Sequence, residues 1–489
     1  MSWADRNIRN GAHRFAYAVA PLYSAALLLT LLLATTGALA PPASTPAQAP
    51  YAGSQGYEIW HTSYVANVVT VVDPADLSVT QTIPLPGGPY TIALGHDPGS
   101  DRDIIFVSLW DSGEIVMIDA ETKQIDKYLT PPYFFDPQLI ASPDGSKIYV
   151  NNCAPRVPAV EIDVASQAFF ELGVTRTWNM EFSADGITGY FDGRWFCTDD
   201  YTGVRIVDLI GGQLVRTAPL DAPRGTSGDG SDLTRIPGTD LFAVAAGSHF
   251  IVVDAEMQTI GVTDLETQGR AAEYPVGIWE IQFRGAHQAF IMNDMGFDGE
   301  VFRYVDVSDP TMPFYPGLDT YFGEPGYNPN RPPVADGFQI IGDYAYFAVP
   351  DNPFCNACST TPVNLEAWDL NIDPPNKAAT LPMPDDGWFT YFAVRKVPVI
   401  EQIANIEADA ATILGAAGVR ESQGNEVIKA LEDAAGRAED GETAKAIRAL
   451  EKALDKINKP IKAGDLSAAE AQPLIDAINA MIEELSAGG

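Results

Sequence analysis

Short runs of apolar and β-branched residues, separated by turn residues, fill the chain from residue 57 to residue 399. The segment "PQLIASPDGSKIYVNN" (137–152) contains two such runs joined by a Pro-Asp-Gly turn, and "AVEIDVASQAF" (159–169) supplies a third. Short apolar runs between turn signals are typical of β-strands rather than helices. The pattern therefore predicts an all-β region in which strands follow one another at close intervals.

A β-branched run that ends in aspartate recurs along this region. The recurring aspartates are 46, 44, 45, 46, 52 and 63 residues apart, so the late intervals contain insertions. Each interval holds four strand-like runs, and four strands per repeat of this length are typical of a β-propeller blade. The aspartate follows the third strand, where its carboxylate is expected to accept backbone N–H groups of the next turn. The aspartates are Asp73, Asp119, Asp163, Asp208, Asp254, Asp306 and Asp369.

The two ends of the repeat region indicate how the ring closes. The first unit starts directly at a second strand, "YEIWHTSY" (57–64), whereas an extra strand, "WFTYFAVRKVPV" (388–399), follows the seventh unit. If the extra strand joins the first unit, seven complete blades result and the seam has no open sheet edge. The sequence therefore predicts a seven-bladed β-propeller with a composite first blade.

The repeat resembles the YVTN β-propeller family in "IYVNN" (148–152), which follows "IASPDGSK" (140–147). "VFRYVDVSDPTMP" (301–313) and "IIGDYAYFAV" (340–349) resemble the related LVIVD repeats. The resemblance implies the propeller fold. It leaves the function open, because this family includes surface proteins, binding proteins and enzyme subunits.

From about residue 400 the pattern changes to helical spacing. Ser467 and Glu470 form a capping-box pattern, Gly441 and Gly464 are expected to separate helices, and Pro460 is expected to kink or end one. The chain there has room for about four helices, which predicts a small all-α bundle. Its apolar stripes contain Ile447, Leu450, Leu454 and Ile457, followed by Leu474, Ile478, Met481 and Leu485.

The order "GETAKAIRALEKALDKI" and "IKAGDLSAAEAQPLIDAINAMIEEL" is similar to the FIMAH-type helical domain. This resemblance implies a module at the end of an exported bacterial protein. It is interpreted either as a bundle that packs on itself or as a docking module for another envelope component.

The N-terminus has the pattern of an export signal, with basic residues before the apolar run "AALLLTLLLA" (25–34). Residues 1–40 are interpreted as a signal peptide or an uncleaved anchor, and residues 41–56 as a Pro/Ala/Ser/Thr linker. Residues 57–399 then form the propeller and residues 400–489 the FIMAH-like domain. Export predicts a secreted protein, whether extracellular, periplasmic or at the cell surface.

The chain is acidic, with 30 Lys and Arg against 65 Asp and Glu, a formal net charge of −35. This balance argues against a nucleic-acid partner and against electrostatic docking on anionic lipid. A membrane contact is therefore expected only through an uncleaved anchor.

The four cysteines are predicted to form disulfides outside the cytosol. All four follow second strands, so the predicted pairs are Cys153 with Cys197, in adjacent blades, and Cys355 with Cys358 in one long loop. A four-cysteine zinc site and free thiols are the alternatives.

Ligand sites of propellers are expected at the mouth of the central channel, where the innermost strands start. The starts carry carboxylates and aromatic side chains, which suit a polar small molecule, a sugar or a hard cation, and calcium is the cation expected for carboxylate ligands. A solvated acidic rim is the alternative. The rim residues are Tyr90, Asp136, Trp178, Asp232, Glu280, Asp336 and Trp388, of which Asp136, Asp232, Glu280 and Asp336 are the candidate metal ligands.

The sequence shows no histidine cluster or nucleophile motif that would assign catalysis. We therefore interpret the protein as an exported binding scaffold for an envelope protein, a polysaccharide or a small molecule at the channel mouth. A propeller enzyme or enzyme subunit, of dehydrogenase or lyase type and acting at the same mouth, is the alternative.

Overall fold

A computed structural model describes the parts of the chain that follow the N-terminal segment. The described residues are 56–133, 137–152, 154, 156–192, 203–219, 232–246, 249–265, 277–294, 300–315, 319–321, 338–350, 363–371, 376–383, 391–439 and 441–488.

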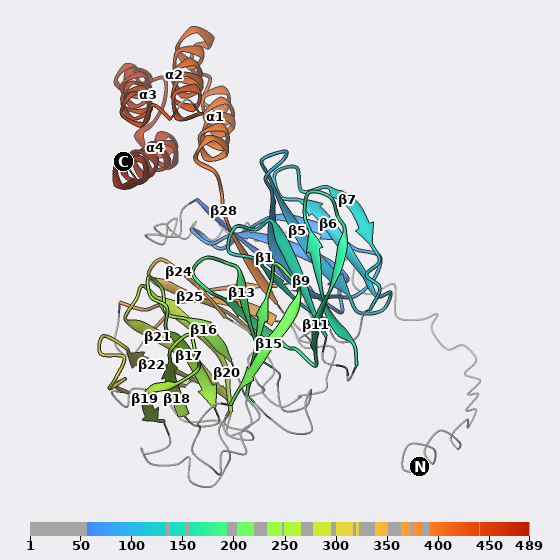
Figure 1. Ribbon diagram of the computed structural model, residues 1–489. Coiled ribbons are helices and arrows are strands. Elements are labelled where there is room, and N and C mark those ends of the chain that lie inside the picture. The colour runs from blue at the N-terminus through green and yellow to red at the C-terminus, as the bar shows by residue number, and fades with distance from the viewer. Residues whose placement is uncertain are drawn as a thin grey trace, which may run out of the picture. The chain divides into compact units, whose positions relative to one another are not determined.

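The strands form seven four-stranded antiparallel sheets, the blades of a β-propeller (Figure 1). Blade 1 contains β28 (Phe392–Lys396), β1 (Tyr57–Ser63), β2 (Val68–Asp73) and β3 (Ser78–Pro84). Blade 2 contains β4 (Pro89–Asp97), β5 (Arg102–Leu109), β6 (Glu114–Asp119) and β7 (Ile125–Leu129). Blade 3 contains β8 (Pro137–Ala141), β9 (Lys147–Asn152), β10 (Pro158–Asp163) and β11 (Phe169–Thr175).

The other four blades repeat this order from inner to outer strand. Blade 4 contains β12 (Asn179–Phe182), β13 (Thr188–Asp192), β14 (Val204–Asp208) and β15 (Gln213–Ala218). Blade 5 contains β16 (Leu233–Arg235), β17 (Phe242–Ala246), β18 (His249–Val253) and β19 (Thr259–Asp264). Blade 6 contains β20 (Gly277–Arg284), β21 (Gln288–Asp294), β22 (Glu300–Asp306) and β23 (Asp319–Tyr321). Blade 7 contains β24 (Phe338–Ile341), β25 (Tyr344–Pro350), β26 (Val363–Asp369) and β27 (Asn376–Pro382).

The composite first blade is confirmed. Strand β28 comes from the C-terminal end of the repeat region and pairs antiparallel with β1, with Tyr57 opposite Lys396 and His61 opposite Phe392. The described strand is shorter than the expected range of 388–399. Because a strand from the end of the region completes the sheet at its beginning, the ring is closed by backbone hydrogen bonds.

The core lies between neighbouring blades, because side chains of a strand point alternately to its two faces. On β1, Ile59 packs into a cluster with Tyr346 and Leu365 of blade 7. The next residue, Trp60, packs with Ile105 and Val107 of blade 2. Both β1 side chains are fully buried. The continuous apolar runs of the sequence follow from this burial on both faces.

The predicted role of the recurring aspartates is confirmed in all seven blades. Each carboxylate accepts at least one backbone N–H of the turn that follows the third strand, at 2.7–3.2 Å. The donors include Ala75 for Asp73, Ser166 for Asp163 and Ser308 for Asp306. The aspartate thus fixes the connection to the outermost strand.

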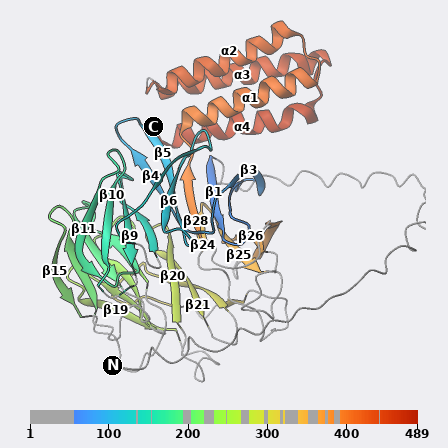
Figure 2. The same cartoon turned by 90° about the vertical axis from the view of Figure 1, so that its right-hand side faces the viewer.

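The C-terminal region forms four helices that lie side by side (Figure 2). They are α1 (Val399–Ala416), α2 (Glu421–Glu439), α3 (Thr443–Ala463) and α4 (Ala468–Gly488). The predicted capping box is confirmed: Glu470 N–H donates to Ser467 Oγ at 3.2 Å, and Ser467 N–H donates to Glu470 Oε2 at 2.9 Å. The two predicted apolar stripes face the core of the bundle, where Leu450, Ile457, Leu474, Ile478, Met481 and Leu485 are buried and Ile447 and Leu454 are partly buried.

One expectation for the bundle needs correction. The expectation that Pro460 ends a helix is wrong, because α3 continues to Ala463 and is capped by Gly464 in the left-handed conformation (φ 78°), whereas a kink at Pro460 stays a prediction. A proline one turn from a helix end removes one backbone hydrogen bond. Pro460 is buried, which offsets part of that loss. Among the described residues, none of the helices is both long and apolar enough to cross a membrane.

Candidate functional site

The structure describes four of the seven predicted rim residues. Tyr90, Trp178, Asp232 and Glu280 lie at or near the starts of innermost strands, on blades 2, 4, 5 and 6. Asp136, Asp336 and Trp388 lie outside the described residues. The prediction of a ligand or calcium site at the rim therefore stays a prediction.

The two described aromatic rim residues are part of the core. Tyr90 is 3% exposed, and its ring packs edge-on against Trp110 and Tyr391 at centroid distances of 4.9 and 5.3 Å. Trp178 is 4% exposed and belongs to the same hydrophobic cluster. Both rings are therefore shielded from solvent.

Asp232, directly before β16 in blade 5, bonds to the blades on both sides. Its Oδ2 accepts the backbone N–H of Ile281, in blade 6, at 2.6 Å. Its Oδ1 accepts a short hydrogen bond from the Nδ2 of Asn179, in blade 4. Asp232 is only 6% exposed, so these hydrogen bonds replace those that water would make with the carboxylate.

Glu280, on β20 in blade 6, repeats this arrangement one blade further on. Its Oε2 accepts the backbone N–H of Phe338, at the start of β24 in blade 7, at 3.0 Å. Its Oε1 accepts the Nε2 of Gln282 at 2.6 Å. Gln282 Oε1 in turn accepts the backbone N–H of Ile340 at 3.1 Å. Two side chains of β20 thus hold the backbone of the next inner strand.

A side-chain-to-backbone hydrogen bond crosses each of the seven seams between blades; we call these bonds latches. In six latches both residues lie on inner or second strands or directly before an inner strand, and the bonds are 2.6–3.2 Å long. In blade order they are Thr62 Oγ1 to Tyr90 O, Thr91 Oγ1 to Pro137 O, Asn151 Nδ2 to Trp178 O, Arg235 N to Glu181 Oε2, Ile281 N to Asp232 Oδ2 and Phe338 N to Glu280 Oε2. The seventh, between blades 7 and 1, runs from Tyr346 Oη to Pro74 O at 3.0 Å.

Sequence analysis missed Tyr346 of the seventh latch and four side chains of the other six, Thr62, Thr91, Asn151 and Glu181. The available signal was a polar residue within an otherwise apolar first or second strand, as in "PYTIAL" (89–94) and "NMEF" (179–182). Burial raises the pKa of Glu181, and the backbone N–H groups of Phe182 and Arg235 oppose that rise. Such a residue is buried because the next blade supplies its hydrogen-bond partners.

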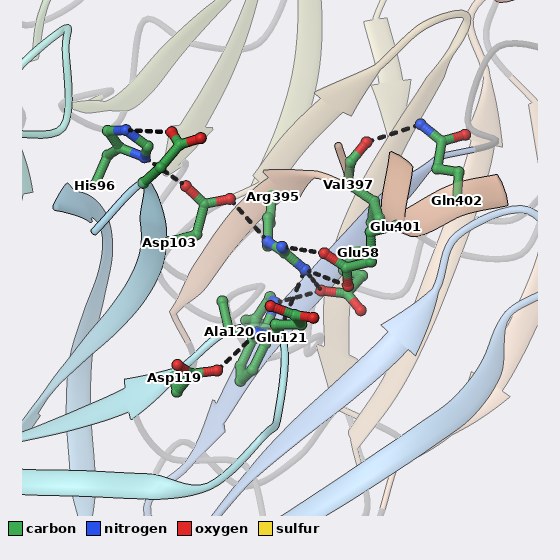
Figure 3. A network of polar contacts seen from close by, with 12 residues as sticks. Glu58, His96, Asp103, Asp119, Ala120, Glu121, Arg395, Val397, Glu401 and Gln402 are labelled. Atoms are coloured by element: carbon green, nitrogen blue, oxygen red, sulfur yellow. Dashed lines mark hydrogen bonds and ion pairs between the residues drawn. The ribbon is translucent and has the colours of Figure 1, made fainter. Parts of the chain in front are cut away.

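A second polar cluster surrounds Arg395 of β28 (Figure 3). The guanidinium is nearly fully buried and pairs with Glu58 of β1 at 3.2 Å, Asp103 of β5 at 3.0 Å and Glu401 of α1. Burial opposes the charge, but the hydrogen bonds that Arg395 donates to Glu401 and Asp103 raise its pKa. One cation therefore joins the closing strand, blade 2 and the first turn of α1.

The same cluster continues on both sides of Arg395. Lys123 donates to Glu58 at 2.6 Å and lies over the ring of Trp60, 4.8 Å from its centroid. His96 Nδ1 lies 3.1 Å from Asp103 Oδ1. Sequence analysis did not single out these residues, because strands far apart in the sequence bring them together.

The chemistry predicted for the cysteines is not tested. Cys153, Cys197, Cys355 and Cys358 lie outside the described residues, between the second and third strands of blades 3, 4 and 7 as expected. Within the part of the chain that the structure describes, no group of three or more His, Cys, Asp or Glu side chains could hold a metal ion.

The helical bundle has a recognised relative. Residues 416–483 match the family model of the FIMAH domain. This match confirms the expected resemblance and covers α2, α3 and most of α4. No curated protein matches the chain.

Solved structures that are similar to this chain include the following three, all at low identity. The dihydro-heme d1 dehydrogenase NirN in complex with DHE is 13% identical with a TM-score of 0.45, over 73% of this chain and 78% of that chain. Apo AztD from Citrobacter koseri is 15% identical with a TM-score of 0.45, over 69% of this chain and 98% of that chain. Kuenenia stuttgartiensis hydrazine synthase is 15% identical with a TM-score of 0.35, over 69% of this chain and 81% of that chain. None of these likenesses bears on what this chain binds or catalyses.

Proposed function

We propose that this protein is an exported β-propeller that acts as a binding scaffold at the cell envelope. Its ligand is held at the channel mouth, and its FIMAH domain serves as an accessory or tethering module. Export is supported by the basic and apolar pattern of residues 1–40. The repeat's resemblance to YVTN propellers, which include surface and binding proteins, agrees with this role.

The observation that carries the proposal is the set of latches at the inner strands. Because side chains such as Asp232 and Glu280 hold the backbone of the next blade, the inner strand starts are fixed relative to one another. A binding site that is already ordered loses less conformational entropy when its ligand arrives. A channel mouth whose strands are fixed in this way therefore suits a protein that binds its ligand on a pre-ordered surface.

The environment of Asp232 argues against a role for this residue as a general base. Both of its carboxylate oxygens accept hydrogen bonds from groups of the protein. A general base must instead reach a proton of the substrate. We therefore assign Asp232 and Glu280 to the architecture of the rim and propose that Asp136, Asp336 and Trp388 supply ligand contacts.

The experiment compares variants at the channel mouth with variants at the opposite face of the propeller. The full chain, expressed with its own N-terminal segment, is first located by cell fractionation and then applied to an array of bacterial polysaccharides with millimolar calcium present. Mouth variants (Asp136→Asn with Asp336→Asn, and Trp388→Ala) are compared with control variants at the opposite ends of the strands (Asp208→Asn and Asp306→Asn). We expect an exported protein whose binding is lost only in the mouth variants.

Two results would contradict the proposal. A protein that remains in the cytosol is not an envelope scaffold. A polysaccharide that the unmodified protein cleaves, with cleavage abolished by the mouth variants, would instead support the lyase alternative.

A further inference from the structure

The seam between blades 7 and 1 differs from the other six. Its latch, from Tyr346 Oη to Pro74 O, lies at the turn after β2, which is the end of the blade away from the channel mouth. Tyr346 lies on a second strand, but Pro74 does not, whereas both residues of every other latch lie on inner or second strands or directly before an inner strand. Within the described residues, the inner part of the seam that closes the ring is therefore held differently.

His61 and Thr70 occupy that part of the seam. They lie opposite each other on β1 and β2, and His61 also lies opposite Phe392 of β28. Ile59, two residues before His61, packs against blade 7, so the alternation of the strand turns His61 to the same face. The His61 and Phe392 rings are 5.3 Å apart between centroids.

Three polar atoms of these two residues are buried without a hydrogen-bond partner. They are Nδ1 and Nε2 of His61 and Oγ1 of Thr70, and both residues are fully buried. Burial lowers the pKa of His61 to about 3, so its ring is neutral. A neutral imidazole has one N–H donor and one acceptor nitrogen, and a hydroxyl can both donate and accept.

A ligand that satisfies these groups must both donate and accept hydrogen bonds. Buried polar groups without partners are rare in native proteins, and ordered water is their usual partner. Water supplies two donors and two acceptors, which matches a neutral imidazole beside a hydroxyl. A metal ion would use the lone pairs and leave the N–H without an acceptor.

We propose that the seam between blades 7 and 1 is a binding site for ordered water, which bridges His61 and Thr70. In the described part of this seam, the water takes the role that direct latches have on the inner and second strands at the other six seams. This inference is independent of the ligand at the channel mouth, because it concerns the closure of the ring.

Replacement of Thr70 by valine gives opposite results for a hydrated and a dry seam. In a hydrated seam Thr70→Val removes a partner of the bound water, and the melting temperature falls by about 2 °C. In a dry seam the same change removes an unsatisfied hydroxyl and adds a methyl group, and the melting temperature rises. A rise would overturn the proposal.

Two control variants calibrate that result in the full chain. Thr62→Val removes a hydroxyl that accepts the N–H of Tyr391 and donates to Tyr90 O, so its melting temperature falls in either case. Thr70→Ser keeps the hydroxyl and is expected to stay closer to the unmodified protein than Thr70→Val does.

A measurement on the unmodified protein decides the question even if a variant does not fold. With 15N-labelled histidine, we expect the His61 ring to give one protected N–H signal with a cross-peak to bound water. An N–H signal without a water cross-peak would overturn the proposal. So would a shift of the ring nitrogens on adding EDTA, because it would identify a metal in place of water.

Discussion

The carboxylate of Asp232 accepts the backbone N–H of Ile281 across the seam between blades 5 and 6, at 2.6 Å. Ile281 directly follows Glu280, whose own carboxylate accepts the N–H of Phe338 in blade 7. Asp232 and Glu280, two carboxylates that were predicted to bind a cation, thus form the latches of two successive seams. The acidic rim is, at these two positions, part of what holds the ring together.

Removal of Arg395 should be among the most damaging single changes in the propeller. Arg395→Met leaves Glu58, Asp103 and Glu401 close together without their cation. Loss of one partner of a buried ion-pair network typically costs about 3–5 kcal/mol. Urea denaturation should show that loss in the free energy of unfolding.

Arg102 provides the matched control. Its side chain is 43% exposed and pairs with Asp119 at 3.0 Å. Exposed pairs contribute little, so Arg102→Met should cost less than about 1 kcal/mol. Similar losses for the two variants would show that Arg395 is not the centre of a network.

The recurring aspartates should differ in their pH dependence although they share one position in the repeat. Burial, together with Asp76 and Glu58, raises the pKa of Asp73 to about 6, against the backbone N–H of Ala75. A raised carboxyl pKa means that the folded state resists ionisation, so stability falls as the pH rises from about 4 through 6. Asp73→Asn, whose amide oxygen can still accept that N–H, should remove this fall and raise the melting temperature at pH 7.5.

Asp163 is the control with the opposite sign. The hydroxyl and the N–H of Ser166 lower its pKa, so its ionised form stabilises the fold above its ordinary pKa and this contribution is lost as the pH falls below it. Asp163→Asn should therefore lower the melting temperature at pH 7.5. If both variants shift it in the same direction, the local environments do not set these pKa values.

Calcium should stabilise the protein if the rim collects cations. A bound ion stabilises the folded state by mass action, so millimolar calcium should raise the melting temperature more than sodium at matched ionic strength. Asp136→Asn combined with Asp336→Asn should remove the difference. Equal effects of calcium and sodium in the unmodified protein would exclude the cation site.

The fold could be predicted from the sequence because its signals are local and repeated. The run ending in aspartate marks each blade, and the missing strand before Tyr57 matches the surplus strand that became β28. The capping box of Ser467 and Glu470 likewise depends on residues only three positions apart.

The polar clusters could not be predicted in the same way. Arg395 meets Glu58 and Asp103 because ring closure brings together residues that are about 300 positions apart in the chain. The rim positions of Asp232 and Glu280 were identified from the strand starts, but the sequence does not show which backbone N–H the carboxylate meets. Which backbone N–H each carboxylate meets depends on the position of one blade relative to the next.

The central claim is that latches on the inner and second strands hold neighbouring blades together and so fix the channel mouth. Amide hydrogen exchange at Ile281 and Phe338 tests it most directly, in Asp232→Ala and Glu280→Ala variants of the full chain. Loss of an acceptor should expose its donor to exchange. We predict faster exchange at Ile281 but not Phe338 in Asp232→Ala, and faster exchange at Phe338 but not Ile281 in Glu280→Ala. Unchanged protection of both amides in both variants would contradict the account.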